Sequence, residues 1–142
     1  MADSLTVARC KLIDLPTSSD RRGLLTVAEA NSAIPFRFRR LYYISGVPEG
    51  EKRGGHAHRA LDELVIALRG TFDVVVSDGS SSATLTMNRP DQALHIPPLV
   101  WHELENFSSD AILLGVASLE YDADDCYRNY EAFLAAAHRT GK

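Results

Sequence analysis

Hydrophobic and polar residues alternate in short runs along most of the chain, a pattern typical of β-strands whose two faces meet different surroundings. Turn-forming residues separate these runs, for example at 20–23 and at 77–80. The strand-like runs, apart from the histidine stretch treated below, cover residues 5–15, 24–28, 38–44, 71–76, 83–87, 93–96, 100–104 and 111–118. Many short strands with regular turns predict an all-β sandwich or barrel.

The pattern changes near the end of the chain. From Asp122 onward the aromatic and apolar residues recur at intervals of three and four, which is the period of an α-helix. These residues are Tyr127, Tyr130, Phe133, Leu134 and Ala137. Asp124 and Asp125 stand where acidic side chains favour a helix N-terminus. We therefore expect one C-terminal helix that covers an end of the barrel.

Composition fits one globular domain over residues 1–142, with 45% hydrophobic and 24% charged residues. A net charge of −4 and the lack of a basic run argue against nucleic acid or an anionic membrane as partner. The longest apolar stretch, near 112–117, is too short to span a bilayer. The first residues do not look like a signal peptide, and Cys10 and Cys126 lie far apart in sequence, so we expect a cytoplasmic protein.

The strongest candidate for chemistry is the stretch 53–58, in which His56 and His58 are one residue apart. Alternate side chains of a strand share a face, so the two imidazoles would lie side by side. The apolar run 64–68 predicts a buried strand behind them. Such a pair is half of a metal site or an acid/base pair, and the alternative is two polar residues on a solvated face.

The spacing around these histidines resembles the two signature motifs of the cupins, a superfamily of small double-sheet β-barrels. Asp91 stands where a glycine normally opens the second motif. The first motif is carried by Gly50, His56, His58, Glu63 and Gly70, and the second by Pro97, Leu99, His102 and Asn106. The resemblance implies a cupin, or double-stranded β-helix jelly-roll barrel, with His102 in the same interior as the paired histidines.

Nearly the whole chain also resembles one group of cupins, the WxcM-like nucleotide-sugar 3,4-ketoisomerases. The residues that carry this resemblance are 20–23, 40–44, 53–59, 96–98, 101–103, 106–108, 117–118, 121–122, Arg128, Tyr130 and Phe133. The chain departs from the family at Glu63, where members carry glutamine, and at Cys126, where a tyrosine often follows the aspartate.

The resemblance implies an isomerase of deoxysugar biosynthesis, for surface polysaccharides or antibiotics. Its substrate would be dTDP-4-keto-6-deoxyglucose and its product a dTDP-3-keto-6-deoxyhexose. The paired histidines are the family's proposed acid/base residues, and no cofactor is required. The family forms homodimers, in some members with exchanged N-terminal strands.

Moving a ketone from C4 to C3 needs a base that takes the C3 proton, an enediol or enediolate intermediate, and an acid that protonates C4. His56 and His58 suit this work because imidazole titrates near neutral pH. Tyr42 can donate a hydrogen bond to the developing oxyanion. Arg40 and Arg53 can bind the diphosphate with bidentate donors, and the alternative for each is a solvated surface position.

Three further residues, Glu63, Trp101 and His102, are expected to line the sugar pocket, and for Trp101 core packing is an equal alternative. The apolar and aromatic positions Leu41, Tyr43 and Ile44 exceed what one small barrel needs to bury, which favours a homodimer.

Two other functional classes stay open from the sequence. One is a metal-dependent cupin enzyme, such as a dioxygenase or isomerase. Its divalent transition metal would be held by the donor set His56, His58, Glu63 and His102. The other is a noncatalytic sugar-binding cupin such as a sensor, although no DNA-binding helix-turn-helix is visible.

Overall fold

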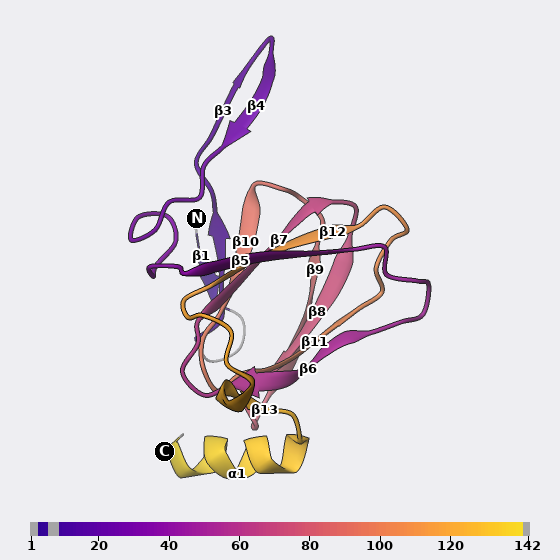
Figure 1. Ribbon diagram of the computed structural model, residues 1–142. Helices are drawn as coiled ribbons and strands as arrows, with labels where there is room; N and C mark the ends of the chain where they lie inside the picture. The colour runs from indigo at the N-terminus through magenta and orange to yellow at the C-terminus, as the bar shows by residue number, and fades with distance from the viewer. Residues whose placement is uncertain (1–2, 6–8, 141–142) are drawn as a thin grey trace.

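Two antiparallel β-sheets face each other in the computed structural model, which describes residues 3–5 and 9–140, and a helix lies across one end (Figure 1). The first sheet has the strand order β1-β2-β10-β7-β12-β5 and the second β13-β6-β11-β8-β9. The predicted all-β jelly-roll barrel of the cupin type, with a C-terminal helix, is confirmed.

The six-stranded sheet consists of β1 (Asp3–Leu5), β2 (Lys11–Asp14), β5 (Arg40–Ser45), β7 (Glu63–Arg69), β10 (Gln92–Ile96) and β12 (Ile112–Ala117). The five-stranded sheet consists of β6 (Arg53–His58), β8 (Phe72–Ser77), β9 (Ser82–Met87), β11 (Trp101–Glu105) and β13 (Cys126–Tyr127). A separate hairpin joins β3 (Thr17–Asp20) to β4 (Gly23–Thr26). The strand predicted over 5–15 corresponds to β1 and β2, while residues 6–8 lie outside the described residues.

Alternation of side chains explains how the sheets form a core. On β8, Phe72, Val74 and Val76 are fully buried between the sheets, while the residues between them are half-buried. Residues 64–67 of β7 are apolar without alternation because both faces of this part of the strand are covered. Val65 packs into the core between the sheets, and Leu64 packs on the outer face against residues of the 28–38 segment.

The C-terminal helix begins later than the sequence pattern predicted. Helix α1 spans Tyr130–Thr140, and Phe133 on its buried face is fully covered. A short 3-10 helix, η1 (Ala123–Asp125), and strand β13 occupy the start of the predicted helix. The expectation that Asp124 and Asp125 mark a helix N-terminus is therefore wrong for α1, because the intervening segment pairs with β6.

Two surfaces of the barrel leave large apolar side chains uncovered. The β3–β4 hairpin projects away from the sheets (Figure 1) and exposes Leu24 by 71% and Leu25 by 65%. On the outer face of the edge strand β5, Leu41 and Tyr43 are also exposed. Ile44, which the sequence grouped with them, packs against the core instead because it lies on the inner face. Among the described residues, no helix is long and apolar enough to cross a membrane.

One glycine makes room for a side chain of the barrel interior. Gly115 on β12 pairs with Tyr42 on β5, and the phenol ring lies directly over the glycine. A Cβ atom added at Gly115 would overlap the ring carbons of Tyr42. The missing side chain therefore determines where the Tyr42 ring can lie.

We expect Gly115→Ala to displace the Tyr42 ring and to lower the free energy of unfolding by about 1–3 kcal/mol, the usual cost of overpacking. Urea denaturation measures this loss. In a Tyr42→Ala background the same glycine substitution should cost much less, because the ring that it meets is gone. Equal losses in both backgrounds would contradict the proposed clash.

Candidate active site

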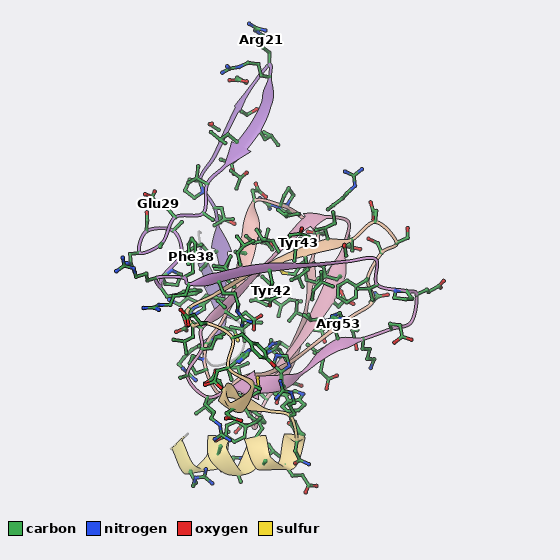
Figure 2. The ribbon with its side chains drawn as sticks, in the orientation of Figure 1. Arg21, Glu29, Phe38, Tyr42, Tyr43 and Arg53 are labelled. Atoms are coloured by element: carbon green, nitrogen blue, oxygen red, sulfur yellow. The ribbon has the colours of Figure 1, made fainter. Side chains whose placement is uncertain are left out.

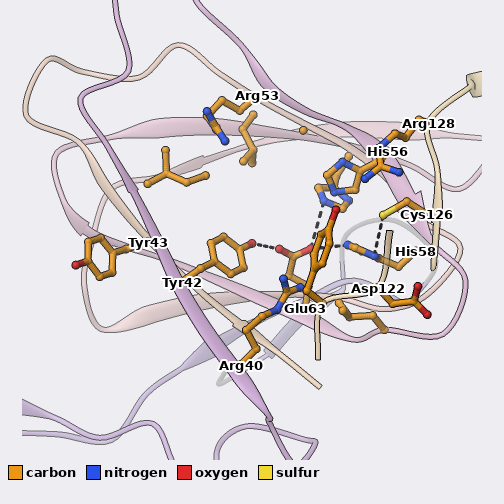
Figure 3. A pocket seen from close by; sticks show the side chains of 16 residues that line it. Arg40, Tyr42, Tyr43, Arg53, His56, His58, Glu63, Asp122, Cys126 and Arg128 are labelled. Atoms are coloured by element: carbon orange, nitrogen blue, oxygen red, sulfur yellow. Dashed lines mark hydrogen bonds and ion pairs between the residues drawn. The ribbon is translucent and has the colours of Figure 1, made fainter. Parts of the chain in front are cut away.

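A pocket of about 410 Å³ opens inside the barrel, and Figure 3 shows the side chains that line it. The walls come from β5, β6, β7 and β11, and from the segment before and after η1. Of the residues predicted from the sequence, the pocket brings together Arg40, Tyr42, Arg53, His56, His58, Glu63 and His102.

Strand pairing places three histidines against one another. His56 on β6 is the direct partner of His102 on β11, and the register shifts just after His102. The ring centroid of His56 lies 5.0 Å from that of His58 and 4.7 Å from that of His102. Gly54 allows this approach, because its φ of +86° and the backbone of β11 close to it disfavour a side chain.

Glu63 lies at the centre of this group. Its side chain is 7% exposed, and its Oε1 lies 3.3 Å from His58 Nε2 and 3.4 Å from His102 Nε2. Oε2 accepts a hydrogen bond from the hydroxyl of Tyr42 (Figure 3). Oε1 is buried and has no hydrogen-bond partner among the described residues. One carboxylate therefore contacts a phenol and two imidazoles.

Burial controls the protonation of the paired histidines. Loss of hydration lowers the pKa of His58 to about 3, and electrostatic repulsion by the neighbouring groups His102, His56, Arg40 and Arg128 lowers this pKa further. Burial, His102 and Arg128 likewise lower the pKa of His56 to about 4. Both imidazoles are therefore neutral at pH 7, the form in which a ring nitrogen can accept a proton.

The two predicted arginines lie at different depths. The Arg40 guanidinium is half-buried, 5.6 Å from the ring centroid of Tyr121 and 5.8 Å from that of Tyr42. Its Nε is buried without a hydrogen-bond partner among the described residues. Arg53 is exposed, at the start of β6 (Figure 2).

The structure adds residues to which the sequence assigned no role in the site. Strand β13 and the residues next to it bring Tyr121, Asp122, Cys126 and Arg128 to the pocket wall. Arg128 is anchored because its guanidinium donates to the backbone carbonyl of Ala123 at 3.0 Å. The sequence pattern did not reveal this segment because its residues fit a helical spacing, whereas in the structure it forms a strand that pairs with β6.

Trp101 does not line this pocket, which corrects one of the two expectations for it. Its neighbour His102 faces the interior, so Trp101 points to the opposite face of β11. There its ring packs 5.8 Å from Phe133 and 5.2 Å from Tyr130, centroid to centroid. Trp101 is therefore a core residue, as the second expectation had it, and its packing joins the barrel to α1.

The four residues His56, His58, Glu63 and His102 also fit a metal ion. Their potential ligand atoms all lie within 4.8 Å of one another, and Glu63 Oε1 has no other hydrogen-bond partner. Three imidazole nitrogens and a carboxylate oxygen suit a divalent transition metal. Such an ion would act as a Lewis acid on a substrate oxygen.

The fold and the site together define a cupin barrel with a histidine-rich interior pocket. The family described as FdtA, WxcM-like, C-terminal matches residues 8–138. The chain belongs to this family.

Curated and solved relatives agree with this assignment. A TDP-4-oxo-6-deoxy-alpha-D-glucose-3,4-oxoisomerase of Aneurinibacillus thermoaerophilus is 38% identical over 123 residues, covering 87% of this chain and 88% of the relative. A mutant of the 3,4-ketoisomerase QdtA from Thermoanaerobacterium thermosaccharolyticum, solved with TDP-4-keto-6-deoxyglucose, superimposes with a TM-score of 0.90 at 33% identity, covering 92% of this chain and 95% of that one. The TDP-quinovose 3,4-ketoisomerase WlaRB of Campylobacter jejuni gives a TM-score of 0.87 at 39% identity, covering 89% and 98%.

The lowered pKa values predict how stability depends on pH. Above pH 6.5 both histidines are neutral in the folded and the unfolded chain, so they do not make the free energy of unfolding depend on pH. Below it the unfolded chain binds protons that the folded chain takes up only near pH 4 and pH 3. The free energy of unfolding should therefore fall as the pH drops from 6.5 toward 4.

His58→Asn removes one of these groups, so its stability should fall less steeply over the same pH range. Urea denaturation of the wild type and the variant at pH 7, 5.5 and 4.5 measures both slopes. Parallel curves would show that His58 binds protons equally well in the folded and unfolded chain.

Proposed function

We propose that this protein is a nucleotide-sugar 3,4-ketoisomerase that converts dTDP-4-keto-6-deoxyglucose to a dTDP-3-keto-6-deoxyhexose. The observation that carries the proposal is the pair of neutral histidines, half-buried His56 and buried His58, next to the Tyr42–Glu63 contact in one pocket. The oxoisomerase and ketoisomerase relatives support it. Residues 1–142 act as one cupin domain in this proposal.

Proton transfer between neighbouring atoms accounts for the reaction. An imidazole nitrogen of His58 or His56 takes the C3 proton, and the electrons of that C–H bond form the C3–C4 double bond of an enediolate. The negative charge moves to O4, where the Tyr42 hydroxyl can donate a hydrogen bond once its hydrogen turns from Glu63 Oε2 to the substrate. A proton then returns to C4, the O3 hydroxyl loses its proton as the C3 ketone forms, and O4 gains a proton to become the C4 hydroxyl. The hydrogens of C3 and O3 are thereby replaced by hydrogens on C4 and O4.

Cationic side chains around the pocket suit the diphosphate of the substrate. The chain as a whole has a net charge of −4, yet Arg40, Arg53 and Arg128 all line this pocket. Arginine presents a planar set of donors that matches phosphate oxygens. Glu63 and His102 lie deeper, where they would contact the sugar ring. The substrate would then bind with its diphosphate toward the arginines and its ketone toward the histidines.

The reaction as proposed needs no cofactor, since every proton donor and acceptor belongs to a side chain. The metal-dependent alternative rests on the fit of the four ligand atoms. A metal bound to His58 and His56 would occupy the nitrogen lone pairs that the proton transfer requires. The two mechanisms therefore predict opposite effects of metal removal.

The decisive test is incubation with dTDP-4-keto-6-deoxyglucose in D₂O, followed by NMR of the sugar. The wild type should form a 3-ketosugar and exchange solvent deuterium into C3 of the remaining substrate. His58→Asn or His56→Asn should still bind the nucleotide sugar but lose turnover by about 10²–10⁴-fold, the usual contribution of general base catalysis. Calorimetry with TDP provides the binding control.

Exhaustive chelation of the wild type separates the metal-free route from its alternative. Full activity after chelation supports proton transfer by the histidines alone. A reversible loss of deuterium exchange on chelation would instead assign the reaction to a metal enzyme. If the wild type binds the ketosugar tightly but exchanges no deuterium, the protein would instead be a noncatalytic sugar-binding cupin.

We further propose that the protein is a cytoplasmic homodimer. Isolated two-stranded hairpins are marginally stable, yet the β3–β4 hairpin projects with Leu24 and Leu25 exposed (Figure 1). The edge strand β5 exposes Tyr43 by 70% on its outer face and has an unpaired edge among the described residues. A second copy that covers the hairpin and β5 would bury both surfaces.

Replacement of Leu24 and Leu25 by serine should shift the protein from dimer to monomer, because these exposed side chains are the largest apolar groups of the hairpin. Sedimentation at micromolar concentration measures the oligomeric state. Leu68→Ser, at an exposed leucine of β7, is the matched control and should stay dimeric. A wild type that is monomeric at this concentration would rule out the dimer.

A further inference from the structure

We propose that Asp125 is a positioning residue for His58. Its carboxylate accepts the Nδ1–H of the imidazole and so directs the lone pair of Nε2 into the pocket. The inference rests on the proposed function, because it specifies which nitrogen of His58 acts as the base.

The backbone around Asp125 is tied to the end of β6. Cys126 pairs with His58 across β13 and β6, so its neighbour Asp125 is held beside the imidazole. The Asp125 backbone carbonyl accepts a hydrogen bond from the Arg59 N–H at 2.7 Å. One carboxylate oxygen, Oδ1, accepts from the Ala60 N–H at 3.0 Å. These contacts hold the Asp125 side chain beside the end of β6, the strand that carries the histidines.

The second carboxylate oxygen is directed at His58. Asp125 Oδ2 lies 3.4 Å from His58 Nδ1, and the two side chains are 11% and 10% exposed. This oxygen is buried and has no hydrogen-bond partner among the described residues. A buried carboxylate oxygen without a donor is costly, so an N–H on Nδ1 would remove that cost.

A neutral imidazole carries one N–H, so its two nitrogens have opposite roles. With the hydrogen on Nδ1, the Nε2 lone pair faces the interior, where Nε2 lies 3.3 Å from Glu63 Oε1. With the hydrogen on Nε2, that nitrogen would instead donate to Glu63 and could not accept a proton from a substrate. Glu63 Oε1 is also buried without a hydrogen-bond partner among the described residues, but His102 Nε2 lies 3.4 Å from it and can donate there in place of His58. The choice of tautomer therefore decides whether His58 can act as a base toward the pocket.

Cys126 is the competing neighbour of the same nitrogen. Its Sγ lies 3.5 Å from His58 Nδ1, and a thiol that donates there would require the hydrogen on Nε2. A thiol is a weak donor, whereas a carboxylate accepts a charge-assisted hydrogen bond. The carboxylate also favours the imidazolium that forms once Nε2 has taken a proton. Asp125 therefore outweighs Cys126 in setting the tautomer.

Asp125→Asn tests the role, because it keeps the shape and the Oδ1 acceptor but removes the carboxylate. The turnover number on dTDP-4-keto-6-deoxyglucose should fall at least about tenfold, with KM changed less than about twofold. Asp124→Asn removes an exposed carboxylate one residue away and is the matched charge control. It should keep the wild-type turnover number and KM.

Nitrogen NMR of ¹⁵N-histidine-labelled protein provides the readout that a purely structural role would not change. His58→Asn identifies the His58 signals by their loss. In the wild type and in Cys126→Ala, His58 should carry its hydrogen on Nδ1, and in Asp125→Asn this preference should weaken or reverse. Circular dichroism checks that each variant is folded.

Wild-type turnover and an unchanged tautomer in Asp125→Asn would overturn the proposal. So would a wild type whose His58 carries its hydrogen on Nε2, or a Cys126→Ala variant in which the tautomer reverses. A wild type that never converts the ketosugar contradicts the proposed function instead. In that case the nitrogen spectra still decide whether Asp125 fixes the imidazole.

Discussion

The buried carboxylate of Glu63 is the constraint on which the interior depends. A carboxylate that is 7% exposed must find polar partners, and it finds them in Tyr42, His58 and His102. Each partner arrives on a different strand of the barrel, β5, β6 and β11, while Glu63 itself begins β7. The requirement to satisfy one charge thus brings strands from both sheets to a common point, which is the point where the proposed proton transfer takes place.

Small residues let these strands approach. Gly115 leaves the space that the Tyr42 ring fills, and Gly54 lets the backbone of β6 pass close to β11. The same positions would be weak choices for strand stability alone, since glycine lowers strand propensity. Their presence is explained by the ring and the imidazoles that they admit, so the packing of the barrel and the geometry of the pocket depend on the same residues.

Local sequence patterns predicted much of the fold and of the site. The features that they did not predict depend on pairing between segments that are distant in the sequence. Alternation predicted the strands, and the spacing of His56 and His58 predicted a shared face. The same alternation, applied to Trp101 and His102, requires that only one of them face the pocket, and the cupin motif had already placed His102 there, so the expectation of both was inconsistent. The tail was misread because Tyr127 fits a helical period, although its backbone pairs with Ala57 of β6. Such pairing is decided by tertiary contacts rather than by local propensity.

The tail links the fold to the chemistry through two adjacent elements. Helix α1 buries Phe133 against Trp101 at the end of the barrel, which holds the C-terminal segment in place. The strand before it, β13, lies against the end of β6, and Cys126 at its start and Asp125 at the end of η1 contact the outer nitrogen of His58. The inner nitrogen meets Glu63. His58 therefore lies between two carboxylates, one from the core of the barrel and one from the tail. In the proposed isomerase, its hydrogen belongs on the side of the tail, because only then does the lone pair face the sugar.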